Sequence, residues 1–266
     1  MAEYPPDHRI RIQTLASGSS GNSILLSSED VNLLVDAGLS CRELSRRLTS
    51  AGLAPGDISA VIVTHEHHDH IRGVGVLSRQ HRVPIYMNTA TLEATHAYVG
   101  EVPTSRTFST GDALKLGDLT VQTYPVLHDA AAPIGVSVTN SSTRIGIALD
   151  MGHPTRLVKE RLRDSDVLIL EFNHDPEMLR QCRRPWELKQ RILGKMGHMS
   201  NEVALELVCE LVHDRLRAVV LAHISREANS PQLVYSLVSE RLKKIGRDDI
   251  EIFLGHQDEV GTRIEA

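Results

Sequence analysis

The chain has 266 residues, 41% of them apolar, and a formal net charge of −5. This length is enough for a substantial buried core, and the acidic balance excludes a uniformly basic body that binds nucleic acid over its whole surface. No apolar run approaches the roughly 18 residues of a membrane span, so we expect no membrane association.

Residues 1–11 are polar, contain two prolines and include no apolar signal region. The cysteines, Cys41, Cys182 and Cys209, are odd in number and far apart. This is typical of reduced thiols in the cytosol and not of disulfides or a cysteine–zinc site. We therefore predict a cytoplasmic protein.

The first half of the chain alternates short apolar runs with turn residues, which predicts strands interrupted by helices. Ser40 has the side chain of a helix N-cap, and Leu44 and Leu48 define an apolar helix face that ends at Gly52. A second helix is predicted over 71–81. The predicted strands are 10–15, 23–26, 32–35, 60–63 and 84–87.

The second half repeats this layout. Ser200 and Ser230 are expected to cap helices over 203–212 and from 231 to 246. The predicted strands are 119–124, 135–139, 144–149, 167–172, 218–222 and 251–254. Two similar halves favour an α/β protein in which two sheets pack face to face with helices outside, an αββα sandwich, and we expect one domain over 1–266.

Histidine is unusually frequent, with 14 residues, and four of them lie between 65 and 70. Residues two apart in an extended chain point the same way, so His65 and His67 can bind one ion, while Asp69 and His70 can face a second. His68 points away and is expected either to face solvent or to support the ligands without touching metal. Imidazole and carboxylate ligands without a thiolate suit zinc, manganese or iron.

Three later residues, His128, Asp150 and His223, each follow a predicted strand. Strand ends that share an edge can bring distant side chains into one cleft. These residues are therefore candidates to complete the metal site.

The pattern Thr64-His65-x-His67-x-Asp69-His70 resembles the signature of the metallo-β-lactamase superfamily. Asp36, His128, Asp150 and His223 match further positions in that superfamily's chain order. Within it, several segments are similar to the YycJ/WalJ family, which is linked to 5′-to-3′ exonuclease activity on DNA: 17–22, 65–75, 125–130, 173–175, 197–201 and 222–226.

The resemblance implies the superfamily's fold, with mixed sheets, and two divalent metal ions, Zn²⁺ or Mn²⁺ with iron as an alternative. Asp150 would bridge the ions, Asp36 would support the ligand loop from behind, and Asp69 would also serve catalysis. The implied ligands are His65, His67, His128 and Asp150 for the first ion and Asp69, His70, Asp150 and His223 for the second.

His198 lies just before the helix that Ser200 is predicted to cap, where an anionic phosphate is favoured. A matching histidine in RNase Z-like nucleases helps to protonate the leaving oxygen, so the resemblance implies a catalytic His198. The alternative is a capping or surface histidine.

A basic stretch leads into His198 and holds the only tryptophan of the chain. Such a stretch is either a solvated helix or a phosphate track with one stacking aromatic. A terminal 5′ phosphate could bind just after His223, or the residues there could cap a loop. The candidates for substrate binding are Arg183, Arg184, Trp186 and Lys189 in the stretch and Arg226 and Asn229 after His223.

Three functions fit these features. The basic stretch and His198 favour a phosphodiesterase, a DNA exonuclease of the DNA-repair type. The negative net charge favours a small-molecule hydrolase, such as a glyoxalase II-like thioesterase or a lactonase. A non-catalytic metal-binding module is disfavoured by the complete ligand set. The choice of metal, DNA over RNA and the oligomeric state stay open.

Overall fold

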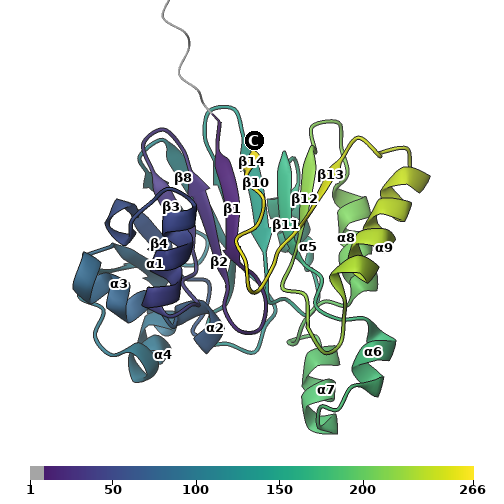
Figure 1. Ribbon diagram of the computed structural model, residues 1–266, viewed down its shortest axis with the longest axis horizontal. Coiled ribbons are helices and arrows are strands. Elements are labelled where there is room, and N and C mark those ends of the chain that lie inside the picture. Colours follow the sequence, from purple (N-terminus) through teal and green to yellow (C-terminus); the bar gives the residue numbers. More distant parts are fainter. Residues whose placement is uncertain (1–8) are drawn as a thin grey trace, which may run out of the picture.

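The computed structural model describes residues 9–266, so most of the N-terminal segment interpreted above lies outside the described residues. Two seven-stranded sheets pack face to face, with helices on their outer faces (Figure 1). The predicted α/β sandwich of two sheets with outer helices is therefore confirmed. Among the described residues, no helix combines the length and apolar character needed to cross a bilayer.

Each sheet mixes antiparallel strands with a parallel set. The strands β3 to β6 run parallel in the first sheet, and β10 to β13 run parallel in the second. The first sheet has the order β14 (Ile264–Glu265), β1 (Arg11–Ala16), β2 (Ser23–Ser27), β3 (Asn32–Val35), β4 (Ala60–Ile62), β5 (Ile85–Asn88), β6 (Ser105–Phe108). The second has the order β13 (Glu251–Leu254), β12 (Ala218–Ala222), β11 (Val167–Glu171), β10 (Arg144–Ala148), β9 (Ile134–Thr139), β8 (Leu119–Pro125), β7 (Ala113–Leu116).

The helices fall into three groups. The first sheet is accompanied by α1 (Cys41–Ser50), the short 3₁₀ helix η1 (Pro55–Asp57), α2 (His68–Ile71), α3 (Val74–His81) and α4 (Thr89–Val99). The second sheet is accompanied by α5 (Arg156–Leu162), α8 (Asn201–Leu211) and α9 (Pro231–Lys244). The pair α6 (Pro176–Gln181) and α7 (Trp186–Leu193) projects beyond the sandwich (Figure 1). We call residues 176–196 the α6–α7 lobe.

The predicted helix starts are confirmed, because Ser40, Ser200 and Ser230 each accept a hydrogen bond from the backbone three residues later. The predicted helix over 71–81 is wrong in one respect. It is divided into α2 and α3 at Gly73, whose N–H donates to Ala37 O instead of continuing a single helix.

The core between the sheets is aliphatic, as expected for a chain with 3% aromatic residues. Ile12 and Leu26 from the first sheet and Val136, Ile147 and Val220 from the second belong to one buried cluster. Separate apolar clusters lie between each sheet and its helices. Burial on both faces explains why the central strands read as continuous apolar runs.

Candidate metal centre

The candidate ligands and the supporting residue Asp36 converge because they follow strands that end at one edge of the sandwich. Asp36 follows β3, His65 follows β4, Asp150 follows β10 and His223 follows β12. His128 comes from the loop after β8. Each of these five residues is at most 2% exposed. The fold therefore buries a set of polar groups that needs a compensating partner.

The backbone is strained at the same strand ends. Asp36, Asp150 and His223 adopt φ values of 64°, 48° and 51°. A non-glycine residue in this left-handed region is uncommon, and such strain concentrates at functional sites. Asp150 and His223 line the shared cleft, whereas Asp36 contacts His70 from behind.

Three imidazoles form the first group. His65 Nε2 lies 3.1 Å from His67 Nδ1, and His128 Nε2 lies 3.2 Å from the same atom. Neighbouring ligand atoms of a tetrahedral zinc site are roughly 3.3 Å apart, because Zn–N bonds are about 2.0–2.1 Å. The three ring nitrogens therefore suit one metal ion.

A second group shares Asp150 with the first. Asp69 Oδ2 lies 3.6 Å from both His70 Nε2 and His223 Nε2. Asp150 Oδ2 lies 2.5 Å from His70 Nε2 and 3.7 Å from His65 Nε2, so it stands between the two groups. Within residues 9–266, both Asp150 oxygens and His223 Nε2 are buried without an aligned hydrogen bond. A divalent cation satisfies such atoms, and the residues present fit one.

Charges in the group shift its proton affinities. Burial raises the pKa of the Asp150 carboxyl, but His223 and His70 outweigh burial and hold that pKa well below its usual range. Burial lowers the pKa of His70, but Asp36, Asp150 and Asp69 together raise it well above normal. The site is therefore built around an anionic carboxylate, which is the form that binds metal.

Polar residues behind the ligands fix their orientation. Asp36 Oδ1 accepts from Thr64 N–H at 2.8 Å, and Asp36 Oδ2 lies 2.7 Å from His70 Nδ1. This contact leaves Nε2 of His70 to face the metal site. On the other side, Asn22 Nδ2 donates to Asp69 Oδ2 at 3.2 Å. Asp36 thus lies behind the ligand loop, as the family resemblance implies.

Gly38 lets the ligand loop approach the β1–β2 loop. A Cβ on Gly38 would stand 1.6 Å from Asp69 O and 2.7 Å from Asn22 N, both backbone atoms. We expect Gly38→Ala to reduce the free energy of unfolding by about 1–3 kcal/mol or more, measured by urea denaturation. Gly56→Ala is the matched control, since nothing lies within 4 Å of its Cβ. Equal stability of the two variants would contradict this packing.

A buried carboxylate that the sequence analysis missed, Glu171, connects His198 to the ligands. Glu171 ends β11 and is 0% exposed. Its Oε1 lies 2.6 Å from His198 Nδ1 and 2.9 Å from His223 Nδ1, and Oε2 accepts from Met151 N–H at 2.9 Å. The available signal was an acidic residue at the end of an otherwise apolar strand.

The contacts between Glu171 and His198 shift both pKa values toward the charged forms. Burial raises the pKa of Glu171, but the contacts with His198 and His223 outweigh it and lower the pKa to about 2. Burial lowers the pKa of His198, but Glu171 and Asp150 outweigh it and raise the pKa to about 9. With Nδ1 held by Glu171, Nε2 of His198 remains as a proton donor to the cavity.

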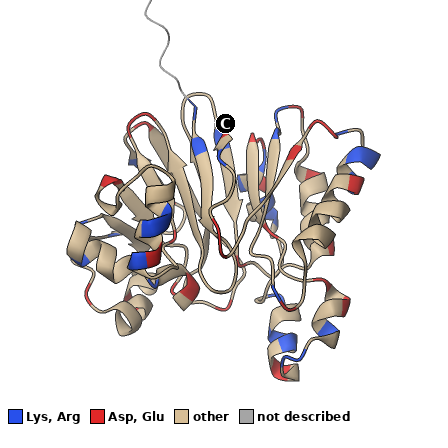
Figure 2. Ribbon diagram, in the orientation of Figure 1, with Lys and Arg blue, Asp and Glu red and all other residues tan. Residues whose placement is uncertain are grey.

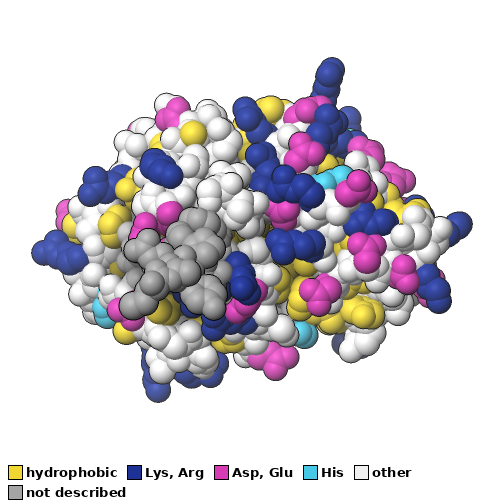
Figure 3. Space-filling view, turned by 90° about the horizontal axis from the view of Figure 1, so that it is seen from above, with side chains coloured by type: hydrophobic (Ala, Val, Ile, Leu, Met, Phe, Trp, Pro, Cys, Tyr) yellow, Lys and Arg dark blue, Asp and Glu magenta, His cyan; other side chains and the backbone are white. Residues whose placement is uncertain are grey.

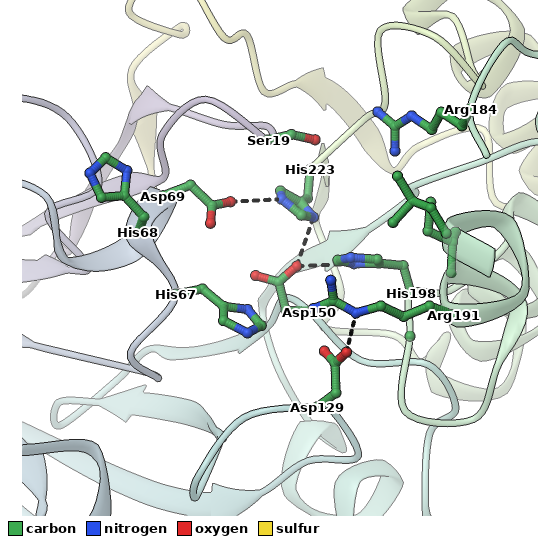
Figure 4. A pocket seen from close by; sticks show the side chains of 13 residues that line it. Ser19, His67, His68, Asp69, Asp129, Asp150, Arg184, Arg191, His198 and His223 are labelled. Carbon is green, nitrogen blue, oxygen red and sulfur yellow. Dashed lines mark hydrogen bonds and ion pairs between the residues drawn. The ribbon is translucent and has the colours of Figure 1, made fainter. Parts of the chain in front are cut away.

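A cavity of about 320 Å³ lies over these groups (Figure 4). Metal-site residues form its floor, and α7 with the segment before it contributes Arg184, Leu188, Arg191 and Ile192. Arg191 is ion-paired with Asp129. The arrangement of an acid donor, candidate ligands and cationic walls suits hydrolysis of an anionic substrate.

Comparison with known proteins identifies the family. Residues 31–224 match the Beta-lactamase superfamily domain. The chain belongs to the metallo-β-lactamase superfamily. It is 37% identical to Exodeoxyribonuclease YycJ of Bacillus anthracis over 239 residues, which are 89% of this chain and 90% of that protein. It is 36% identical to Exodeoxyribonuclease WalJ of Streptococcus pneumoniae serotype 2 over 232 residues, 86% of each chain.

These two relatives place this metallo-β-lactamase-fold chain in the YycJ/WalJ family, and it is a metal-dependent hydrolase. The crystal structure of the metallo-beta-lactamase fold protein YhfI from Bacillus subtilis superposes with a TM-score of 0.75 at 18% identity. That match covers 97% of this chain and 100% of the other. The His/Asp cluster described above is the candidate site for divalent metal.

Some substrate-binding candidates of this hydrolase lie at the cavity, and others lie on the surface of the α6–α7 lobe. Arg184 lines the cavity, and Arg183 and Trp186 are exposed on the α6–α7 lobe, with Trp186 57% exposed. His68 is exposed at the cavity rim, and Figure 4 shows its ring directed away from Asp150.

The structure differs from the sequence analysis for three of these candidates. Lys189 is 8% exposed and its Nζ donates to Arg180 O at 2.6 Å, because this face of α7 packs toward α6. Asn229 is buried and donates to Phe172 O at 2.8 Å. Arg226 is ion-paired with Asp258 and lines a separate cavity. None of the three is brought to the metal cavity.

Proposed function

We propose that the protein is a two-metal phosphodiesterase that degrades DNA from the 5′ end. The observation that carries the proposal is the 2.6 Å contact between Glu171 Oε1 and His198 Nδ1 beside Asp150. A sugar alkoxide is a poor leaving group and needs a proton as it departs. A thiolate, with a pKa near 8.5 for a cysteine thiol, needs this help much less, so the pair favours a phosphodiester over the thioester alternative.

The names of the two relatives support the same substrate, since both are exodeoxyribonucleases. We infer two ions, Zn²⁺ or Mn²⁺ with iron as an alternative. His65, His67 and His128 form one group of possible ligands, and Asp69, His70 and His223 form another. Asp150 Oδ2 lies near His65 of the first group and His70 of the second. Such ions supply Lewis acidity and an activated water. The seven ligands are His65, His67, Asp69, His70, His128, Asp150 and His223.

The protein's own groups then complete the reaction. Water attacks phosphorus, the bond between phosphorus and O3′ breaks, and the proton on His198 Nε2 passes to O3′. Glu171 keeps His198 oriented and charged before this transfer. The products are a 3′ hydroxyl and a 5′ phosphate.

We further propose one hydrolase domain over 1–266, in a cytoplasmic protein that takes part in DNA repair. The two sheets share one apolar core, which supports a single unit. Cys41, Cys182 and Cys209 are free, which supports a reducing compartment.

The direct test is incubation with end-labelled duplex DNA and Mn²⁺. Release of the 5′ label as mononucleotides before any 3′ label supports the proposal. A matched RNA duplex, a glutathione thioester and a lactone serve as competing substrates. Hydrolysis of the thioester or lactone with no release from DNA would establish the small-molecule alternative.

The exposed basic residues of the α6–α7 lobe provide a test of DNA binding. The lobe carries several basic positions beside a few acidic ones (Figure 2). Acidic and basic side chains are also intermixed at the opposite end of the molecule (Figure 3). Arg183→Gln with Lys195→Gln should weaken DNA binding and lower the salt slope by about one per lost contact. Fluorescence anisotropy at several salt concentrations measures both quantities.

The matched control neutralises Lys243 and Lys244, which are exposed in the last turn of α9. It makes the same change in net charge away from the cavity. If both double variants gave the same affinity and salt slope, the lobe would have no special role in binding DNA.

A further inference from the structure

The position of His198 defines which side of the cavity receives the leaving group. His198 N–H donates to Ile192 O at 3.0 Å, so the end of α7 is fixed beside the proton donor. Asp69 and His68 lie on the opposite side of Asp150 (Figure 4). Arg184, Leu188 and Ile192 line the cavity on the same side as His198, and we call them the α7 wall. In the proposed reaction the leaving nucleotide, whose O3′ faces His198, therefore lies along this wall.

That wall has the chemistry of a nucleotide pocket. Leu188 and Ile192 provide apolar contacts for a sugar or base, and Arg184 provides a cation on the same wall. The cavity of about 320 Å³ is at the lower end of the roughly 300–1,000 Å³ that ligand pockets occupy. Such a volume suits one nucleotide rather than a run of nucleotides.

The two arginines that line the cavity, Arg184 and Arg191, differ in their ion pairs. Arg191 is ion-paired with Asp129, which comes from the loop next to His128. Arg184 makes one contact, from Nε to Glu227 Oε2 at 3.3 Å, and the Glu227 side chain is 56% exposed. Within the described part of the chain, neither Nη atom of Arg184 has a hydrogen bond. This fork of two guanidinium nitrogens therefore remains available for an anion.

We propose that Arg184 binds the 5′ phosphate of the terminal nucleotide, and that the α7 wall holds this single nucleotide while its 3′ bond is cut. This proposal rests on the nuclease function proposed above. It explains the polarity: the strand enters with its 5′ end against Arg184 and its first internucleotide phosphate over the metal ligands.

Each cleavage leaves a strand end of the same kind, so the reaction can repeat. Attack by water breaks the bond between phosphorus and O3′, and His198 gives its proton to O3′. A 5′ mononucleotide leaves from the α7 wall, while the shortened strand keeps the attacked phosphate as its new 5′ phosphate. Every cleavage therefore regenerates the group that Arg184 recognises.

The test compares one duplex oligonucleotide carrying either a 5′ phosphate or a 5′ hydroxyl. Wild-type protein should prefer the phosphorylated end. Arg184→Ala should lower kcat/KM on that end by about 10–100-fold, the effect of losing hydrogen bonds to a charged group, with a much smaller change on the 5′ hydroxyl. Arg184→Lys should retain part of the preference, because it keeps the charge but not the fork.

Arg180→Ala is the matched control. Arg180 belongs to the same lobe, is ion-paired with Glu177 and does not line the cavity, so the preference ratio should not change. Thermal unfolding and metal content of Arg184→Ala establish that it is folded and loaded. A folded Arg184→Ala protein with the wild-type ratio overturns the proposal, as does a wild type that degrades both ends equally. A wild type that degrades neither end refutes the nuclease function itself.

Discussion

Asp150→Ala should lose most of its bound metal and nearly all of its activity. The Asp150 carboxylate lies between the two ligand groups, with Oδ2 near both His65 and His70. Replacing residues that merely orient metal ligands costs 10–100-fold in metal affinity or activity, so loss of a shared ligand should cost more than about 100-fold. Elemental analysis after gel filtration in metal-free buffer measures the content, and initial rates on DNA measure the activity.

A second measurement separates metal loss from misfolding. A metal that binds only the folded state adds stability, by about 2.7 kcal/mol at a concentration of 100 Kd. Wild-type protein should therefore melt at a higher temperature with metal than with chelator, and Asp150→Ala should show little difference. Asp258→Ala is the carboxylate control, because that side chain is 81% exposed. Full metal occupancy in Asp150→Ala would refute the shared-ligand assignment.

Sequence patterns predicted the parts of this structure that depend on local chemistry. The strand Asn32–Val35 and the cap at Ser200 were both predicted, because an apolar run and a side-chain acceptor are local signals. The helix α4, Thr89–Val99, was missed. Its buried residues are Thr91 and Thr95, not a stripe of large apolar side chains, so the period of a helix is hard to see.

The site was predicted where a motif spans it and missed where tertiary contacts define it. The ligands from His65 to His70 are adjacent in the chain. The role of Glu171, in contrast, depends on tertiary structure, because β11 brings it beside His198 and His223. Lys189 shows the opposite case. Its charge predicts a surface position, but the packing of α7 buries it. Sequence supplies residue types, and packing decides which of them reach the cavity.

His198→Ala should lose roughly 10²–10⁴ in turnover on DNA while it keeps its metal. The expectation follows from position: Nδ1 of His198 contacts Glu171 at 2.6 Å, and the ring lines the cavity beside Asp150. The assay is initial-rate hydrolysis of DNA at saturating substrate, with elemental analysis of the same preparation. His153→Ala is the control, since that histidine is exposed and lies three positions beyond Asp150.

The size of the loss should depend on the leaving group. The 3′ alkoxide of DNA needs a proton as its bond to phosphorus breaks, whereas p-nitrophenolate is stable without one. His198→Ala should therefore be far less impaired on bis(p-nitrophenyl) phosphate than on DNA. A purely structural role would lower both rates together, because a displaced Asp150 or His223 affects every substrate at the same metals. Equal losses on the two substrates would thus assign His198 to metal-site architecture and remove the proton-transfer step that orients the leaving nucleotide toward α7.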